Sequence, residues 1–171
     1  MRLVLKGRTT PAVSAGTAFK LNKRQIRAAN RAVRRYLEAA SSKTLLSGRT
    51  PRDFKSLFTG DIRNIAAGKD RRILSDSGLP KPTTDTRVTA QVSLRALAGP
   101  DGNLVFVAAT IDERIRYTAS RGGVAIHRFG ELLLIKVKGS RFGIAGYDID
   151  LNRWLPGTPP TTTSAKATTT T

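Results

Sequence analysis

The 171-residue sequence has no cysteine, and only one histidine, one methionine and one tryptophan. Without cysteine there can be no disulfide bond, no thiol nucleophile and no zinc site built on cysteine. Cysteine-free proteins occur on both sides of a membrane, so this absence leaves the redox compartment open. The chain also lacks the motifs of dinucleotide-binding loops, phosphate-binding loops, serine hydrolases and zinc proteases.

Acidic residues are scarce as well. The chain carries 12 Asp and Glu against 30 Lys and Arg, which gives a formal net charge of +18. The excess is largest in residues 1–40 and declines along the chain. Such a field favours polyanions such as nucleic acid, anionic lipid or phosphorylated wall polymer, with a merely solvated basic surface as the alternative. No apolar run approaches the roughly 20 residues that span a bilayer, so no transmembrane segment is predicted.

Both ends differ in composition from the middle of the chain. Residues 1–21 are predicted to be a flexible basic arm, or the remnant of a signal or anchor, because Lys6 and Arg8 interrupt the apolar stretch of an export signal. Residues 154–171 are rich in Thr and Pro and nearly free of apolar side chains, so we expect a disordered tail. Residues 22–153 are the length of a single domain.

The stretch "NKRQIRAANRAVRRYLEAA", residues 22–40, predicts an amphipathic helix. Asn22 and Gln25 match a capping box at its start. Apolar side chains from Ile26 to Ala40 share one face at helical spacing, which predicts docking on a core. A second face carries a basic stripe that is free to meet solvent or a polyanion, formed by Lys23, Arg24, Arg27, Arg31, Arg34 and Arg35.

Short helices are predicted to follow this long one. One begins at Thr50 and Pro51, and Asp61 and Asp70 are expected to cap two more. The helical half of the chain then offers a set of large apolar side chains for a small pocket or core: Val33, Tyr36, Leu37, Phe54 and Phe58.

From Thr86 onward the apolar period changes from that of a helix to two, which is typical of strands. Four strands are predicted, within residues 87–97, 103–117, 124–137 and 142–154, with bulges at Gly130 and at Ala145-Gly146. The predicted fold class is α+β, with a long N-terminal helix and short helices packed on a curved four-stranded antiparallel sheet.

Candidates for chemistry are few. Glu113 interrupts an apolar strand face, and His127 lies on the next strand, so these two are the only weak catalytic candidates; pairing of Glu113 with an arginine is the alternative. The segment "DIDLN", residues 148–152, begins like a calcium loop but has Arg153 and Pro159 where that loop needs Gly and Glu. We therefore predict no metal, no cofactor and no enzymatic activity.

The order of these elements, ending in "RFGELLLIKVKGSRFGIAGYDIDL", resembles the nuclear transport factor 2 superfamily. It looks most like extracytoplasmic actinobacterial members such as Mce-associated-type domains, to which "AVRRYLEAA" and "LFTGDIRNIAAGKDRRILSDSGLPK" are also similar. The resemblance covers roughly residues 22–153 and implies a cystatin-like cone. Enzymatic members carry a His/Asp or Tyr/Asp set inside the cone, and only His127 and nearby carboxylates correspond here. A non-enzymatic domain of the cell envelope is therefore implied.

Three functions remain open. The first is a non-enzymatic binding or assembly module, secreted or envelope-associated, with an envelope protein or anionic polymer as partner and possible homodimerisation through the sheet. The second is a polyanion binder that uses the basic stripe and contacts nucleic acid only nonspecifically. The third is a cone-pocket isomerase or hydrolase, which requires His127 to point inward beside a carboxylate. A cytoplasmic location is the alternative to the envelope.

Overall fold

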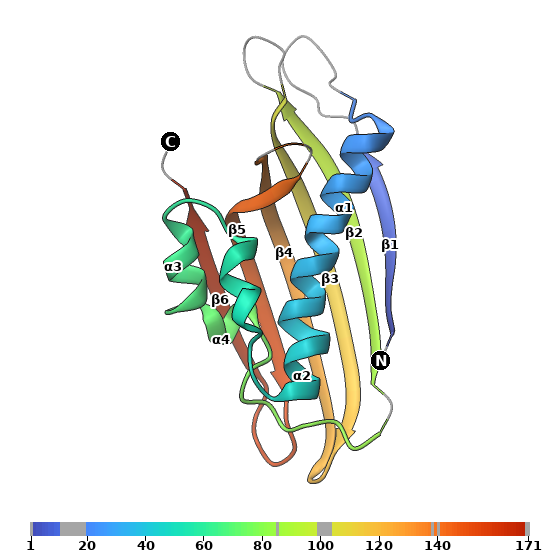
Figure 1. The fold of residues 1–171 in the computed structure, drawn as a ribbon. Coiled ribbons are helices and arrows are strands. Elements are labelled where there is room, and N and C mark those ends of the chain that lie inside the picture. Colours follow the sequence, from blue (N-terminus) through green and yellow to red (C-terminus); the bar gives the residue numbers. More distant parts are fainter. Residues whose placement is uncertain are drawn as a thin grey trace.

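A six-stranded sheet with the order β1-β2-β3-β4-β5-β6 forms one layer of the protein, and helices cover one of its faces (Figure 1). The computed structural model describes residues 2–10, 20–84, 86–98, 104–137, 139 and 141–169. We call the covered face of the sheet inner and the opposite face outer. The strands are β1 (Arg2–Thr10), β2 (Arg87–Ala98), β3 (Leu104–Ala119), β4 (Gly122–Lys136), β5 (Phe142–Trp154) and β6 (Thr161–Thr168).

The predicted α+β class is confirmed, but the predicted count of four strands is wrong. Strands β2 to β6 form an antiparallel meander of five, and β1 adds to β2 in parallel. Strand β6 lies in the segment that we expected to be a disordered tail. Its threonines are β-branched and suit a strand, and Ala165 is buried against the core where it pairs with Ile149.

The inner face of β2 and β3 follows the predicted alternation. Val88, Ala90, Val92, Leu94 and Ala96 of β2 are all buried, as are their counterparts on β3. The predicted bulge at Ala145 is confirmed by a register shift opposite Leu133 and Leu134. No register shift occurs at Gly130, which instead has a φ of 137° and approaches β5 so closely that a Cβ would collide with the Asp148 carbonyl oxygen.

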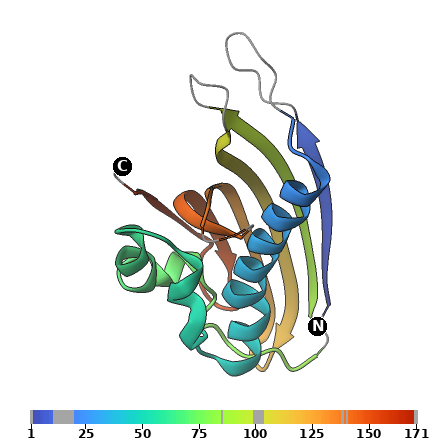
Figure 2. The same ribbon diagram turned by 45° about the horizontal axis from the view of Figure 1, so that its top comes forward.

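A long helical rod crosses the inner face. It consists of α1 (Lys23–Leu37), the π-helical turn η1 (Glu38–Ser42) and α2 (Lys43–Ser47). Both hydrogen bonds of the predicted capping box are present, from Gln25 N to Asn22 Oδ1 at 2.9 Å and from Asn22 N to Gln25 Oε1 at 2.8 Å. Figure 2 shows the strands bending around α1, so the inner face is concave.

The remaining helices are η2 (Arg52–Leu57), α3 (Ile62–Ala67) and α4 (Arg71–Leu74). Neither Asp61 nor Asp70 makes the expected capping hydrogen bond. Asp70 instead accepts a hydrogen bond at 2.8 Å from the Tyr147 hydroxyl of β5, which ties α4 to the sheet. Within the described residues no helix is long and apolar enough to cross a membrane.

Candidate functional site

Arg128 of β4 lies at the centre of a buried group of polar side chains, which we call the Arg128 cluster: Arg128, Glu113, Asp76 and Ser41. Glu113 is the cross-strand partner of Arg128, and both point to the inner face. Arg128 donates from Nη2 to Asp76 Oδ1 at 2.7 Å and from Nη1 to Ser41 Oγ at 2.7 Å. Arg128 Nη1 also donates to Glu113 Oε2. All four residues are at most 1% exposed.

The π-helical turn η1 brings the helical rod to this cluster. Lys43 N–H bonds to the Glu38 carbonyl, one residue further back than in an α-helix. The carbonyl of Ala40 accepts from Asp76 N at 2.8 Å, which fixes the loop that carries this carboxylate. Ser41, in the same turn, donates to Glu113 Oε2 at 2.8 Å. The turn therefore positions two of the four cluster residues.

The charges of the cluster are unequal, because one buried guanidinium faces two carboxylates. Burial raises the pKa of Glu113 from its ordinary 4.5 to about 7, an effect that Arg128 opposes and Asp76 reinforces. Arg153 of β5 adds a second cation, with Nη2 4.0 Å from Asp76 Oδ1. Burial lowers the pKa of Arg153.

The Arg128 cluster is closed to solvent. None of the three described pockets is lined by its residues. Within the described part of the chain, Asp76 Oδ2, Glu113 Oε1 and Arg128 Nε have no hydrogen-bond partner. A buried charge has to be paired to be tolerated. The pair of Arg128 with Glu113 lies within the sheet, and the pair of Arg128 with Asp76 joins the sheet to the helical layer. The geometry is that of an ionic link between layers.

The two candidate catalytic residues lie on opposite faces of the sheet. Glu113 points inward to Arg128, as the alternative of an arginine partner predicted. His127 points outward, with Nε2 3.1 Å from Asp112 Oδ1 and its ring 4.7 Å from that of Phe129. Successive strand residues alternate between faces, so an inward Arg128 requires an outward His127. The enzyme hypothesis required His127 to point inward beside a carboxylate, and the structure instead places it on the outer face.

The five residues expected to form a pocket or core all lie in the core. Val33, Tyr36, Leu37, Phe54 and Phe58 are at most 2% exposed, and none lines a described pocket. Their rings pack on one another: Tyr36 lies 6.3 Å from Phe54 and 6.2 Å from Phe58 between ring centroids. Phe58 in turn meets Tyr147 of β5 at 5.9 Å, which extends the packing to the sheet.

The six residues of the basic stripe are all exposed on α1. The stripe therefore faces solvent, while the apolar stripe of the same helix is buried. Arg34 has its Nε 3.5 Å from Glu38 Oε1, one turn further along.

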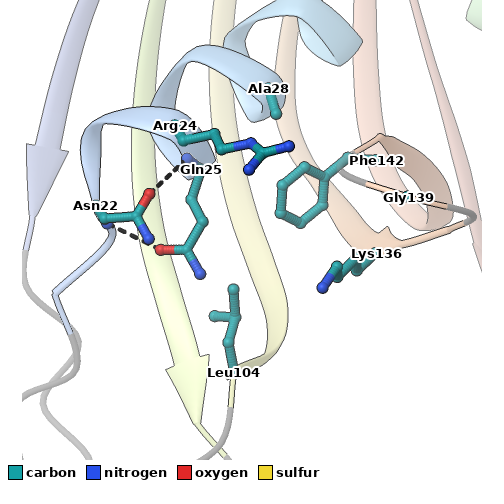
Figure 3. A pocket seen from close by; sticks show the side chains of 8 residues that line it. All are labelled: Asn22, Arg24, Gln25, Ala28, Leu104, Lys136, Gly139 and Phe142. Carbon is teal, nitrogen blue, oxygen red and sulfur yellow. Dashed lines mark hydrogen bonds between the residues drawn. The ribbon is translucent and has the colours of Figure 1, made fainter.

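An open pocket lies at the start of α1, which we call the α1 pocket (Figure 3). It has a volume of about 360 Å³ and is lined by Asn22, Arg24, Gln25, Ala28, Leu104, Lys136, Gly139 and Phe142. Arg24 extends from α1 toward the ring of Phe142, and Lys136 projects from the end of β4 (Figure 3). The pocket thus combines two basic side chains with an apolar lining.

Sequence reasoning singled out Arg24 but missed Lys136, Phe142 and Leu104. These residues lie more than 75 positions from Arg24 in the sequence and meet it only through the sheet topology. No spacing rule connects them. One feature of the sequence could have indicated the pocket: Phe142 follows "KGSR" at the start of a predicted strand. An aromatic side chain at a strand end needs another residue to cover it.

No protein-family model matches this chain, and no curated protein or solved structure matches it significantly. The structure itself defines an α+β domain with helices on one face of an open sheet.

Proposed function

We propose that this protein is a non-enzymatic binding module that takes a small amphipathic anion in the α1 pocket. The observation that carries the proposal is the lining of the pocket: Ala28, Leu104 and Phe142 are apolar, whereas Arg24 and Lys136 are cationic. Ligand pockets typically measure about 300–1,000 Å³ and combine a mostly apolar wall with a few polar groups. A carboxylate with a short acyl chain fits both the size and the charge.

Octanoate, octanol and octylamine test this proposal, because they share one tail and differ in the charge of the head. Isothermal titration should detect binding of octanoate, weaker binding of octanol and none of octylamine. Lys136→Glu should weaken octanoate binding by about tenfold or more, since it places a like charge beside the ligand head. Arg31→Glu makes the same charge change on α1 away from the pocket and should leave binding unchanged. Equal binding of all three ligands would contradict the proposal.

We further propose kinship with the nuclear transport factor 2 superfamily and a place in the cell envelope. The support for kinship is a long helix on the concave face of a curved meander, together with the sequence resemblance over residues 22–153. The resemblance to extracytoplasmic domains supports the location. Fractionation of cells that express the native gene, followed by amino-terminal sequencing of the product, tests it; recovery in the cytoplasm alone would contradict it.

A homodimer through the sheet is part of the same proposal. The support is a group of half-buried apolar side chains on the outer face of β2, β3 and β4: Leu97, Phe106, Leu133 and Ile135. Such a face gains free energy when a second copy covers it. Sedimentation should show a dimer that Leu133→Glu converts to a monomer.

A second candidate function is polyanion binding through the basic stripe. The observation that favours it is the exposure of all six cations on one side of α1. Nothing in a row of charges reads base edges, so binding should be blind to sequence. For duplex DNA the plot of log K against log salt should slope at about −4 to −6 if the whole stripe engages. Replacing Arg27, Arg31 and Arg34 with Glu should flatten that slope; a sequence preference beyond about tenfold would contradict nonspecific binding.

A further inference from the structure

The outer face of the sheet carries a second group of cations, at the end where β2 begins. The strand register arranges them in rows: Arg87, Arg116, Ala125 and Trp154 lie side by side across β2 to β5. The next row holds Thr89, Arg114, His127 and Asn152. Rows on one face are two residues apart, which is about 7 Å. We call this surface the outer basic face; it lies across the sheet from α1 and the α1 pocket.

Two neighbouring hollows mark this surface. One has a volume of about 310 Å³ and is lined by Arg114, Arg116, His127 and Trp154, among others. The other measures about 260 Å³ and is lined by Arg87, Thr89, Arg114 and Arg116. Arg114 and Arg116 line both hollows. The small side chain of Ala125, between Arg116 and Trp154 in the row, leaves room for the first hollow.

Rings accompany the cations. Trp154 is 42% exposed, one of three large apolar side chains on the described surface whose exposure reaches 40%. His127 stacks against Phe129, which lies in the third row, with ring planes at 32°. Trp154, His127 and Phe129 therefore place a ring in each of three successive rows. The first two of these rows also carry the arginines, whereas Phe129 lies between Asp112 and Asp150. A solvated basic face needs no exposed tryptophan, so the rings require a separate explanation.

The charges are only partly neutralised. Asp112 Oδ1 lies 3.2 Å from Arg114 Nε and 3.1 Å from His127 Nε2, so one carboxylate holds both side chains in place. Among the described residues no carboxylate lies within ion-pair distance of Arg87 or Arg116. Two of the three guanidinium groups therefore have no carboxylate partner among the described residues.

We propose that the outer basic face binds single-stranded nucleic acid, with phosphates on Arg87, Arg114 and Arg116 and bases stacked on Trp154 and the neighbouring rings. Strand binders that ignore sequence combine a cationic track with aromatic platforms, because every base has a π-face. A duplex hides those faces, so the single strand is the better fit. An acidic peptide would satisfy the arginines but not the rings, and an anionic lipid surface, which also attracts tryptophan, is an outcome of the test below.

Trp154 is the only tryptophan in the chain, so its fluorescence reports directly on this surface. Titration of a short oligothymidylate into the full-length protein at low salt should quench that fluorescence saturably. The slope of log K against log salt should be about −2, at roughly 0.7 per phosphate neutralised by the three arginines. An abasic strand with the same number of phosphates should bind about tenfold more weakly and should not quench.

Variants separate this surface from the basic stripe of α1. The double variant Arg114→Ala and Arg116→Ala should weaken binding of labelled oligothymidylate by at least about tenfold and reduce the salt slope by about 1.4. Trp154→Ala should weaken it by about tenfold, and Trp154→Phe should restore most of the loss. Arg52→Ala removes an exposed arginine from the helical layer, and Glu at Arg27, Arg31 and Arg34 reverses the stripe; both should leave quenching unchanged.

Two results would overturn the proposal. One is equal binding and quenching by the abasic strand, by a poly-glutamate peptide or by anionic vesicles, which would show that only charge is sensed. The other is unchanged affinity in the double arginine variant while its thermal unfolding matches that of the parent. Neither result depends on octanoate binding, so this proposal and the one for the α1 pocket fail separately.

Discussion

At the scale of single residues, Arg128 decides how the two layers are joined. Its guanidinium reaches Asp76, which is 52 positions away in the sequence, and Ser41, which is 87 positions away. Arginine is almost never fully buried unless it is paired, and here each pairing partner is buried too. The cluster therefore links strands β3 and β4 to the helical rod and to the loop after α4.

Removal of the cation should destabilise the fold strongly. Arg128→Met leaves Glu113 and Asp76 buried without their counter-charge, and breaking a buried pair in this way costs about 3–5 kcal/mol. Chemical denaturation should show a loss of that order in the free energy of unfolding. The double variant that adds Glu113→Leu should recover part of the loss, because Asp76 is then the one carboxylate left and still has Arg153 Nη2 4.0 Å away. A stable single variant would contradict the structural role of the cluster.

The protonation of Glu113 should make stability depend on pH. Its pKa is 4.5 ordinarily and about 7 in the fold, so between these values the folded state holds a proton that the unfolded state has released. The contribution of Glu113 to the free energy of unfolding is therefore greatest below pH 4.5. It falls as the pH rises to about 7 and is constant above that. The total change is about 3 kcal/mol at one group.

Glu113→Gln is the matched control for that dependence, since glutamine keeps the shape but cannot titrate. Denaturation curves of both proteins should be collected from pH 4 to 8 in steps. The free energy of unfolding of the parent minus that of Glu113→Gln should fall by about 3 kcal/mol between pH 4.5 and 7. Parallel curves for the two proteins would show that Glu113 has the same pKa in the folded and unfolded chain.

At the scale of elements, α1 shows what sequence patterns can establish. Its start, capping box, buried face and basic stripe were all predicted from helical spacing, because each depends on neighbours within one or two turns. The alternation of β2, β3 and β5 was predicted for the same reason. The bulge predicted at Gly130 was wrong. Arg128 and Gly130 both occupy inward positions of β4, which is unbroken there, but neither is apolar, so the sequence pattern suggested a break in the strand.

Long-range pairing explains most of the other failures. Strand β6 has only Ala165 and Ala167 as apolar inward residues, so its sequence lacks the alternation that identifies a strand. The α1 pocket and the Arg128 cluster both bring together residues from the helical half and the strand half. Such contacts depend on the register and curvature of the sheet, which no local pattern encodes.

A pair of substitutions on α1 tests the docking of that helix. Val33→Asp places a carboxylate at a position with 0% exposure, opposite apolar side chains, and should cost about 3 kcal/mol or more. Arg31→Ala, two residues earlier on the exposed face, should change stability by less than about 0.5 kcal/mol. Thermal or chemical denaturation measures both. Unfolding of Val33→Asp at the parent's midpoint would mean that α1 is not packed on the sheet.

At the scale of the whole molecule, the sheet separates two kinds of surface. The inner face is filled by the helical layer, and the α1 pocket opens at its rim. The outer face carries rows of arginines and rings at one end and half-buried apolar side chains at the other. A dimer through the apolar end would leave the outer basic face open, so the two proposals for this side of the sheet are compatible.

The integrity of the sheet depends on its last strand. Strand β6 pairs with β5 from Thr161 to Thr168, Thr169 N donates to the Ala145 carbonyl at 2.8 Å, and Lys166 Nζ lies 2.6 Å from Asp148 Oδ2. Removal of residues 159–171 would leave the hydrogen-bonding groups of β5 at an unprotected edge. We expect the truncated chain to lose about 2 kcal/mol, which lowers the Tm by about 4–8 °C, and to associate at high concentration.

Substitutions within β6 show whether the loss of stability on truncation comes from the packing of β6 or from the shorter chain. Ala165→Asp puts a charge at a residue that is 4% exposed and should reproduce most of the loss in Tm. Thr162→Asp introduces the same side chain on the exposed, outward position of the strand and should change stability by less than about 1 kcal/mol. Scanning calorimetry gives the Tm of each variant, and light scattering follows association. If the truncated chain and Ala165→Asp both unfold with the parent, β6 contributes nothing to the folded state, and the sheet ends at β5.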